Sequence, residues 1–366
     1  MIKSVPVLMY HYISHWKNAN ALSPDRFEDH CQTLTRKGWR GIGLDEAEQF
    51  FLKGKPLPDK CALFTFDDGY LDNYVYAAPI LQQYGHQGVV FAVTGKLEPA
   101  ETPRPTLADV RGGSSSQTDL PRVDAPMVPH RLGFEEREDT FMNWEEARTL
   151  ERTGTMRVSC HSAWHKAVFT GPEFSGFYQP EARTRTFDRV DADVVWGLPR
   201  FATGSRLAHR AFLPSPRLIQ AIRNLVPQEK DEAFAFFADP EKTEHLKALV
   251  AEFPQNELGA YEDSMSMQAA LRRELSLAKE TLEREMGREE RSLCWPWGAY
   301  CADALCIAKE LGFRVFFTTA MGANPPGEAD HVHRFKAKDK PGPWLASRLN
   351  IYSRPWISKL YTLVRM

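Results

Sequence analysis

The sequence predicts an α/β barrel in which strands and helices alternate along the chain. Apolar runs with the length of buried strands, at residues 61–66 and 88–93, are separated by a helical stretch at residues 74–85. This alternation favours a parallel sheet. Barrels with insertions reach 366 residues, so we predict one barrel spanning residues 1–366 in place of two independent domains.

Local signals predict the remaining elements. A helix begins at a Ser23 cap and closes at Gly38, and a second helix begins at Leu44. Further strands are expected at residues 156–160 and 293–295, each directly before a polar or aromatic motif.

Two long segments interrupt the alternation. Residues 97–140 contain a Gly-Gly-Ser-Ser-Ser run and several prolines, which predict a loop insertion. Residues 167–269 contain amphipathic stretches at 215–222 and 245–250, which predict a helical insertion. Both segments follow motifs expected near the active centre, so we expect them to wall a substrate cleft. A solvent-side decoration or a dimer contact is the alternative.

The C-terminal tail, residues 337–366, has a different character. It interleaves aromatic and aliphatic residues with basic ones, among them Trp344, Leu349, Tyr352, Trp356, Leu360, Arg348, Arg354 and Lys359. A helix packed on the barrel and an interfacial segment resting on anionic lipid use the same residue types. We expect a packed helix, and a peripheral membrane contact is the alternative.

The most informative motif is Thr65-Phe66-Asp67-Asp68-Gly69, in which two adjacent carboxylates follow an apolar strand. Like charges this close push their pKa values apart, so the pair favours a bound cation or two different catalytic tasks. An isolated Asp-Asp-Gly is more often a solvated turn. The other motifs of the chain favour the functional interpretation.

Two histidines four residues apart, His161 and His165, follow the strand at residues 156–160. This spacing places both imidazoles on one face of a turn, which is a spacing that metal sites use. Together with Asp68 they would form a facial set that leaves coordination positions open. The spacing alone is weak, because such pairs also occur by chance.

The third motif is Trp295-Pro296-Trp297-Gly298, a turn that follows a strand. Proline fixes one backbone dihedral and glycine permits the next, so the peptide N–H groups between them can point toward a ligand. An oxyanion site requires such a donor. As a single motif, an aromatic turn more often serves packing.

In this order the three motifs resemble the polysaccharide deacetylase family, carbohydrate esterase family 4. The opening strand at residues 5–11 resembles the branch that includes poly-N-acetylglucosamine deacetylases, and residues 57–92 and 141–147 are similar to family stretches around the same motifs. The resemblance covers residues 5–95, 141–166 and about 270–336. It implies a distorted (β/α)7 barrel with the active site at the carboxyl ends of the strands.

The resemblance also implies roles for individual residues. Asp67 is the expected catalytic base, and the metal ligands are Asp68, His161 and His165. The N–H of Trp297 is the expected oxyanion donor. The expected substrate contacts are Tyr70, Pro296, Gly298 and Tyr300. The expected cofactor is one divalent ion, with zinc as the first candidate, although two histidines and one aspartate also accept cobalt, nickel or iron.

The chain departs from the common family pattern in two places. The arginine that often precedes the Pro-aromatic-Gly turn is missing, and Arg334 is the candidate that holds Asp67 in its place. The late histidine motif is also missing. We therefore expect His11 to be the general acid, with His331 and His333 as alternatives.

Composition limits the partners and the compartment. The formal charge of −2 and a sequence pI of about 6.6 give no electrostatic case for a nucleic-acid partner. No stretch approaches the length of a transmembrane helix, and the apolar N-terminal residues belong to the first strand, so no secretory signal is expected. The six cysteines are too sparse for a disulfide framework, which favours a reducing, cytoplasmic location.

The leading functional hypothesis is a metal-dependent N-deacetylase that acts on an N-acetylated sugar. The saccharide could be an oligosaccharide, a lipid-linked intermediate or a nucleotide sugar. A catalytically silent saccharide-binding barrel is the alternative from another class, but the chain keeps Asp67 and the three expected ligands. Deacylation of another amide, such as a formamido sugar, is a further alternative because the metal chemistry is the same.

Overall fold

Parallel strands form the centre of the molecule. The computed structural model describes residues 1–124, 127–130, 133–180, 187 and 190–364. The main sheet has the strand order β15-β14-β9-β6-β5-β1-β16, with β4 paired to the start of β5, and every pairing in it is parallel. Its strands are β1 (Val7–Tyr10), β4 (Arg40–Gly41), β5 (Cys61–Asp68), β6 (Gly88–Ala92), β9 (Met156–Cys160), β14 (Ser292–Cys294), β15 (Val315–Phe317) and β16 (Phe335–Lys336).

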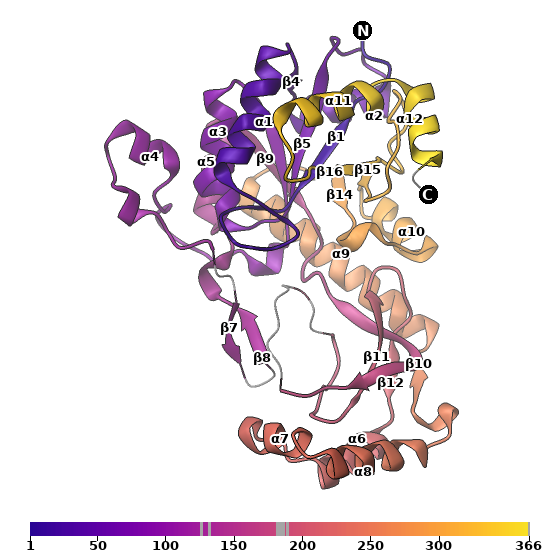
Figure 1. Ribbon diagram of the computed structural model, residues 1–366. Coiled ribbons are helices and arrows are strands. Elements are labelled where there is room, and N and C mark those ends of the chain that lie inside the picture. Colours follow the sequence, from indigo (N-terminus) through magenta and orange to yellow (C-terminus); the bar gives the residue numbers. More distant parts are fainter. Residues whose placement is uncertain (125–126, 131–132, 181–186, 188–189, 365–366) are drawn as a thin grey trace.

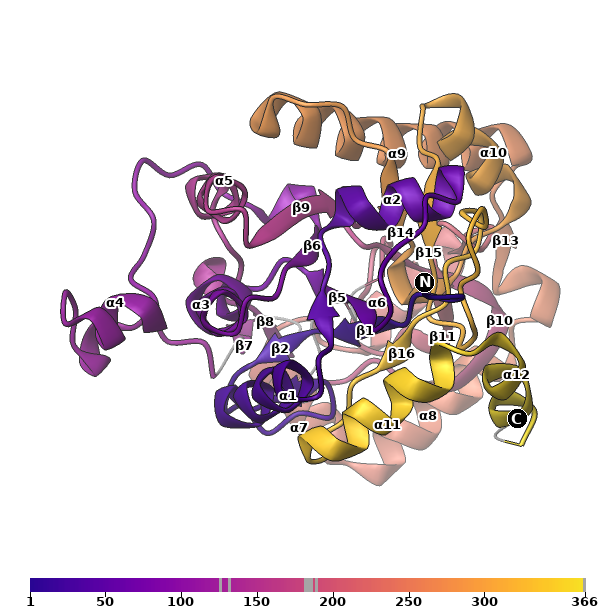
Figure 2. The same cartoon turned by 90° about the horizontal axis from the view of Figure 1, so that it is seen from above.

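The two edges of this sheet meet at the segment that leads into β16. Val332 forms a parallel bridge with Phe317 of β15, and three residues further on β16 pairs with β1. The sheet is therefore curled into a distorted barrel, as Figure 2 shows from above. The predicted (β/α)7 barrel is confirmed.

Helices surround the sheet on its outer side (Figure 1). They are α1 (Pro24–Arg36), α2 (Leu44–Lys53), α3 (Ala78–Gln83), α5 (Trp144–Arg152), α9 (Ser264–Met286), α10 (Ala302–Glu310), α11 (Gly342–Tyr352) and α12 (Pro355–Leu363). The sequence explains their packing: Ser23 caps α1 by accepting from the N–H of Arg26, and the apolar face with Phe27 and Leu34 is buried. Every residue of β5 is buried, as expected for a strand covered on both faces.

The segment after β6 contains more regular structure than the predicted loop. It includes the short helix α4 (Leu107–Gly112), which has a Thr106–Asp109 capping box, and the antiparallel pair β7 (Met127–His130) and β8 (Gly133–Glu136). The guanidinium of Arg104 binds the buried carboxylate of Glu146 on α5, which fixes the start of this segment to the barrel. Whether residues 97–140 form one insertion stays a prediction, and residues 125–126 and 131–132 lie outside the described part.

The segment from residue 167 to 269 lies beyond one end of the barrel (Figure 1). It contains α6 (Pro216–Leu225) and α8 (Pro240–Ala251), which match the two predicted helical stretches, and a further helix, α7 (Lys230–Phe237). It also contains strands that the helical pattern did not predict: β10 (Ala167–Phe177) pairs with β11 (Pro199–Ser205), and β12 (Phe212–Pro214) pairs with β13 (Gly259–Tyr261). Aromatic contacts such as Phe169 with Phe201 stabilise these antiparallel pairs.

This segment has its own hydrophobic core. The cluster includes Trp196, Phe201, Leu218, Ile222 and Leu246, and it is separate from the large core of the barrel. A segment that buries its own apolar surface can hold a fixed shape beside the barrel. Its status as a distinct unit over residues 167–269 stays a prediction, and residues 181–186 and 188–189 lie outside the described part.

The tail divides into two helices. Leu345, Leu349 and Tyr352 of α11 are buried, and α11 packs on α1, where Gly342 donates its N–H to Asp29. Among the residues of α12, only Ser358 is buried. In the part of the chain that the structure describes, no helix combines the length and apolar character needed to cross a bilayer.

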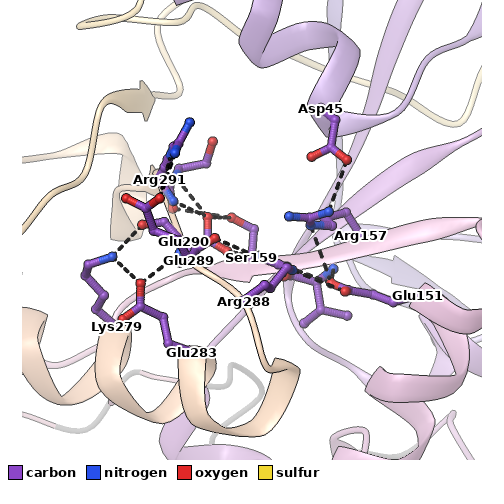
Figure 3. A network of polar contacts seen from close by, with 12 residues as sticks. Asp45, Glu151, Arg157, Ser159, Lys279, Glu283, Arg288, Glu289, Glu290 and Arg291 are labelled. Atoms are coloured by element: carbon purple, nitrogen blue, oxygen red, sulfur yellow. Dashed lines mark hydrogen bonds and ion pairs between the residues drawn. The ribbon is translucent and has the colours of Figure 1, made fainter.

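A polar network joins β9, β14 and α9 through Glu290 (Figure 3). The buried carboxylate of Glu290 accepts from the Ser159 hydroxyl of β9, from the N–H of Ser292 of β14 and from Arg288. The ammonium of Lys279 on α9 donates to the Glu290 carbonyl oxygen. Because one carboxylate satisfies donors from several elements, its loss would leave buried donors without a partner.

We therefore expect Glu290→Ala to lower the free energy of unfolding by about 2–4 kcal/mol. The matched control is Glu289→Ala, because Glu289 is exposed and pairs with the exposed Arg291, and its loss should leave the free energy of unfolding nearly unchanged. Urea unfolding followed by circular dichroism measures both values. Equal effects of the two substitutions would contradict the structural role of Glu290.

Candidate active site

The two adjacent aspartates lie at the carboxyl end of β5 and point in different directions. Both side chains are almost fully buried. Asp68 has a φ of 75°, and Gly69, which follows, has a φ of 81°. A left-handed backbone is costly for a residue with a side chain, so this bend is held in place by its surroundings. It turns the two carboxylates toward separate partners.

Asp67 is bound by Arg334, the arginine that directly precedes β16. The two terminal nitrogens of Arg334 lie 2.6 Å and 2.9 Å from the two carboxylate oxygens of Asp67, which is a bidentate pair. Arg334 also donates to the Thr318 carbonyl oxygen and to the Thr65 hydroxyl. Burial alone raises the pKa of Asp67, but the Arg334 guanidinium outweighs it and holds the pKa well below the usual range.

Asp68 instead lies beside the two histidines. Its Oδ1 atom is 3.5 Å from Nε2 of His161 and 3.7 Å from Nε2 of His165. Nδ1 of His161 lies 2.7 Å from the Cys294 carbonyl oxygen, which can only accept, so Nδ1 carries the proton and Nε2 keeps its lone pair. Burial lowers the pKa of His161 to about 4 and lowers the pKa of His165 well below its usual value.

The Asp68, His161 and His165 group fits a divalent metal ion. Its three ligand atoms all lie within 4.8 Å of one another, and all three side chains are buried. Two ligands about 2.1 Å from an ion at a tetrahedral angle lie about 3.4 Å apart, close to the observed oxygen–nitrogen separations. Neutral imidazoles and an ionised carboxylate are the forms that bind metal.

A second group with metal-ligand spacing consists of Asp67, His161 and Cys294. Its thiol sulfur lies 3.8 Å from Oδ1 of Asp67. Burial raises the pKa of Cys294 well above its usual value, so the thiol is protonated and is a poor ligand. The carboxylate of Asp67 is also already paired with Arg334. The Asp68 group is therefore the better metal site.

His11 directly follows β1, which ends at Tyr10, and lies close to Asp67. Its Nε2 atom is 3.9 Å from Oδ2 of Asp67, and its ring is partly exposed. Burial lowers the pKa of His11, although the charge of Asp67 acts in the opposite direction. An imidazole here is near both the proposed base and solvent.

Two residues that sequence analysis did not identify hold the backbone around His11. The side-chain amide of Asn73 donates to the His11 carbonyl oxygen at 2.8 Å and to the Asp72 carboxylate at 2.7 Å. Asp72 also accepts from the N–H of Ile13, and its burial raises its pKa well above the usual value. Asn73 begins a π-helical turn, an irregular geometry that is frequent at functional sites. Asp72 and Asn73 lie four and five positions after Asp68, and this closeness in sequence was the signal that could have identified them.

The turn after β14 places Trp297 beside the metal-ligand candidates. The Trp297 ring lies 4.1 Å from the His165 ring, measured between centroids, and is 45% exposed. Its φ of 54° is left-handed, which is costly for tryptophan. Gly298 is needed next to it, because φ is 70° there and a Cβ atom would lie 2.2 Å from the Thr319 hydroxyl oxygen.

The other predicted substrate contacts differ in their accessibility. Pro296 is buried within the turn, whereas Tyr300 is half-buried and stacks on Trp295. The Tyr70 side chain is 1% exposed and stacks between Tyr12 and Phe141. A saccharide could reach Tyr70 only if these neighbours moved. All four substrate contacts stay predictions.

The alternative acids lie in a different environment. Nδ1 of His331 is 3.1 Å from the Tyr300 hydroxyl, and the His331 ring packs against His333. Both histidines line a surface groove that also includes Lys309 and Arg314. In the described part of the chain, neither histidine contacts Asp67, which favours His11 as the acid.

Residues with a left-handed backbone conformation cluster at this site. Among the described residues, those other than glycine with positive φ are Lys60, Asp68, Ser162, His165, Phe187 and Trp297. Apart from Lys60, all of them belong to the candidate metal ligands or to the segments in contact with them. Phe187, which the sequence analysis did not single out, packs on His165 with 4.4 Å between ring centroids. Such strain persists only where the surroundings enforce it.

Comparison with known proteins supports the fold and the motifs. Residues 54–194 match the family model for polysaccharide deacetylase. The resemblance to this family seen in the sequence is therefore confirmed over these residues. The match includes Asp67, Asp68, His161 and His165, and it ends before the Trp297 turn and Arg334.

Individual relatives match shorter or more divergent stretches. YxkH of Bacillus subtilis (strain 168) is 38% identical over 89 residues, or 24% of this chain and 32% of YxkH. The poly-beta-1,6-N-acetyl-D-glucosamine N-deacetylase of Escherichia coli (strain K12) is 22% identical over 193 residues, or 53% of this chain and 24% of that enzyme. The matches thus span about a third or less of these relatives' lengths. A de-N-acetylase structure from Aggregatibacter actinomycetemcomitans shares the fold, with a TM-score of 0.59, 16% identity, and coverage of 94% of this chain and 99% of that one.

Burial of His161 predicts how the stability of the metal-free protein depends on pH. The unfolded state protonates this histidine near its ordinary pKa of about 6.5, whereas the folded state does so only at about 4. Between these values the unfolded state binds more protons, so stability is full above the unfolded pKa and falls as the pH is lowered toward 4. We expect this loss to be on the order of 2 kcal/mol for His161 alone.

Guanidinium unfolding between about pH 7 and about pH 5 with a chelator present measures this loss. His161→Asn should have a shallower pH dependence than the wild type. The matched control is His245→Asn, because His245 is exposed on α8 and its replacement should leave the slope unchanged. An unchanged slope in His161→Asn would contradict a neutral, buried imidazole.

Proposed function

We propose that this protein is a metal-dependent N-deacetylase that hydrolyses the acetamide of an N-acetylated sugar to a free amine and acetate. The observation that carries the proposal is that the two adjacent carboxylates have different partners. Asp67 is bound by Arg334, and Asp68 faces His161 and His165. Two like groups with different partners can perform two different tasks.

Asp68, His161 and His165 are the proposed metal ligands, and zinc is the first candidate because all three donors suit it. Cobalt, nickel and iron are accepted by the same donors. A divalent ion bound here would acidify water and polarise the amide carbonyl. The His161–Cys294 hydrogen bond supports this assignment, because it orients Nε2 toward the site.

Asp67 is the proposed general base, because the depressed pKa keeps its carboxylate ionised and able to accept a proton from the attacking water. Arg334 is a positioning residue that acts through Asp67. The peptide N–H of Trp297 is the proposed donor to the developing oxyanion, and His11 is the proposed acid that protonates the leaving nitrogen. The closeness of His11 to Asp67 supports this pairing.

The proposed substrate is a saccharide that contains N-acetylglucosamine. The support is the similarity to an enzyme named for poly-beta-1,6-N-acetyl-D-glucosamine. Lipid-linked saccharides and nucleotide sugars contain the same acetamide. Deacylation of a formamido sugar is the second candidate, because the described residues do not define an acyl pocket. A silent saccharide-binding barrel is disfavoured, because Asp67 and the three ligand candidates are all present.

The binding partners and the cellular location of the protein are proposals as well. We propose no nucleic-acid partner, because the net charge is −2. The six cysteines are all free thiols, which is consistent with a reducing, cytoplasmic location.

The test is release of acetate from N-acetylglucosamine oligomers and N-acetylated nucleotide sugars after metal loading. Asp67→Asn should keep its metal and lose about 10²- to 10⁴-fold in turnover, because an amide cannot accept the proton. His11→Ala should show a loss of the same order. The matched control is His333→Ala, which should keep wild-type turnover.

Each other outcome identifies a specific error. Formate released in place of acetate would favour the formamido substrate, and no acyl release from any tested amide would favour the silent barrel. Full turnover in His11→Ala with an inactive His333→Ala would move the acid to the late pair.

A further inference from the structure

The last described helix, α12, turns an apolar face outward. Trp356, Leu360, Leu363 and the next residue, Val364, are 68%, 58%, 63% and 87% exposed. In a helix, positions separated by four, seven and eight residues share one side, so these four side chains form one stripe. In the described part of the chain, no other helix or strand exposes as many large apolar side chains.

The opposite side of α12 faces the barrel. Ser358 is buried, and the Tyr361 ring packs edge-on against Tyr352 of α11 with 6.0 Å between centroids. The Arg348 guanidinium of α11 lies 5.0 Å from the centroids of both Trp344 and Tyr361, which joins the two helices. Because α11 is anchored on α1, the outward stripe is presented on a fixed support.

The charged residues around this stripe are all basic. Residues 340–366 contain no Asp or Glu, although the chain as a whole is slightly acidic with a net charge of −2. They contain the basic residues Lys340, Arg348, Arg354, Lys359 and Arg365, the last outside the described part. Arg354 and Lys359 are exposed, and Lys359 lies beside Leu363 on the outward side of α12.

We propose that α12 docks the protein on an anionic lipid surface. Its apolar stripe would enter the boundary between headgroups and acyl chains, while Arg354 and Lys359 meet the acidic headgroups. A second copy of this chain fits less well, because two copies would bring two basic segments together. The sequence left two alternatives for the tail, a packed helix and a segment resting on lipid. Under this proposal both hold, because α11 packs on the barrel and α12 is the interfacial helix.

Docking through α12 orients the enzyme. Figure 1 places α12 at the end of the molecule away from β10 to β12 and α6 to α8. Those elements would then extend away from the lipid surface. A saccharide chain in the aqueous phase could approach them while the barrel stays bound to the membrane.

The test is sedimentation of the full chain with vesicles of phosphatidylcholine containing phosphatidylglycerol and, in parallel, with vesicles of phosphatidylcholine alone. The wild type should sediment with the anionic vesicles and much less with the neutral ones. Trp356→Ser combined with Leu360→Ser should weaken the binding at least about tenfold, because two large side chains no longer enter the lipid. Lys359→Glu should weaken binding to anionic vesicles, and added salt should do the same.

The matched control is Phe234→Ser combined with Met265→Ser, because these side chains are also large, apolar and exposed but lie on α7 and α9. This variant should bind as the wild type does. Circular dichroism and thermal unfolding check that both double variants fold.

Two outcomes would overturn the proposal. Equal vesicle binding by the α12 double variant and the wild type would mean that another surface holds the lipid. Absence of vesicle binding, together with a dimer in light scattering that the α12 double variant abolishes, would mean that a second copy covers the stripe. Neither outcome depends on whether the protein releases acetate.

Discussion

The buried ion pair between Asp67 and Arg334 is the interaction on which the rest of this structure depends. A buried carboxylate without a partner is strongly disfavoured, and the bidentate guanidinium supplies one. The same guanidinium binds Thr65 of β5 and the Thr318 carbonyl after β15. Arg334 itself lies between Val332, which bridges to β15, and β16, which pairs with β1. One side chain therefore joins the closing edges of the barrel and fixes the proposed base.

The pair also explains how Asp67 can remain ionised beside a second aspartate. Arg334 compensates the charge of Asp67, and Asp68 faces the two histidines that are its proposed partners in binding a cation. Burial keeps both histidines neutral, which means that protons do not compete for their lone pairs near neutral pH. These charge states are the ones that the proposed metal ligands require. The cost is a cluster of strained backbone at Asp68, His165 and Trp297.

Local sequence signals predicted the parts of the site that lie within single motifs. Asp67, Asp68, His161 and His165 were identified because each pair is close in sequence and follows an apolar strand. Resemblance to a family supplied Arg334, whose partner is 267 residues away in the chain. The barrel followed from the alternation of strands and helices. The strands of the insertion were missed, because the two amphipathic stretches indicate helices and the aromatic contacts between β10 and β11 join residues far apart in the sequence.

Other parts of the site depend on contacts between distant segments, which residue patterns do not encode. The Cys294 carbonyl that orients His161 is a backbone group with no signature. Phe187 belongs to the segment 167–269 and meets His165 only after this segment has folded back onto the barrel. Asn73 is easier to identify from the sequence, because it lies shortly after the paired aspartates. Its hydrogen-bond partner, however, is the backbone carbonyl of His11 at the end of β1.

Anomalous diffraction from zinc-soaked crystals, recorded at the zinc edge, tests the central claim most directly. The account predicts one peak per chain, about 2.0–2.2 Å from a carboxylate oxygen of Asp68 and from the Nε2 atoms of His161 and His165, with Asp67 still paired to Arg334. A peak bound by Asp67 and the Cys294 sulfur, with Arg334 displaced, would contradict it.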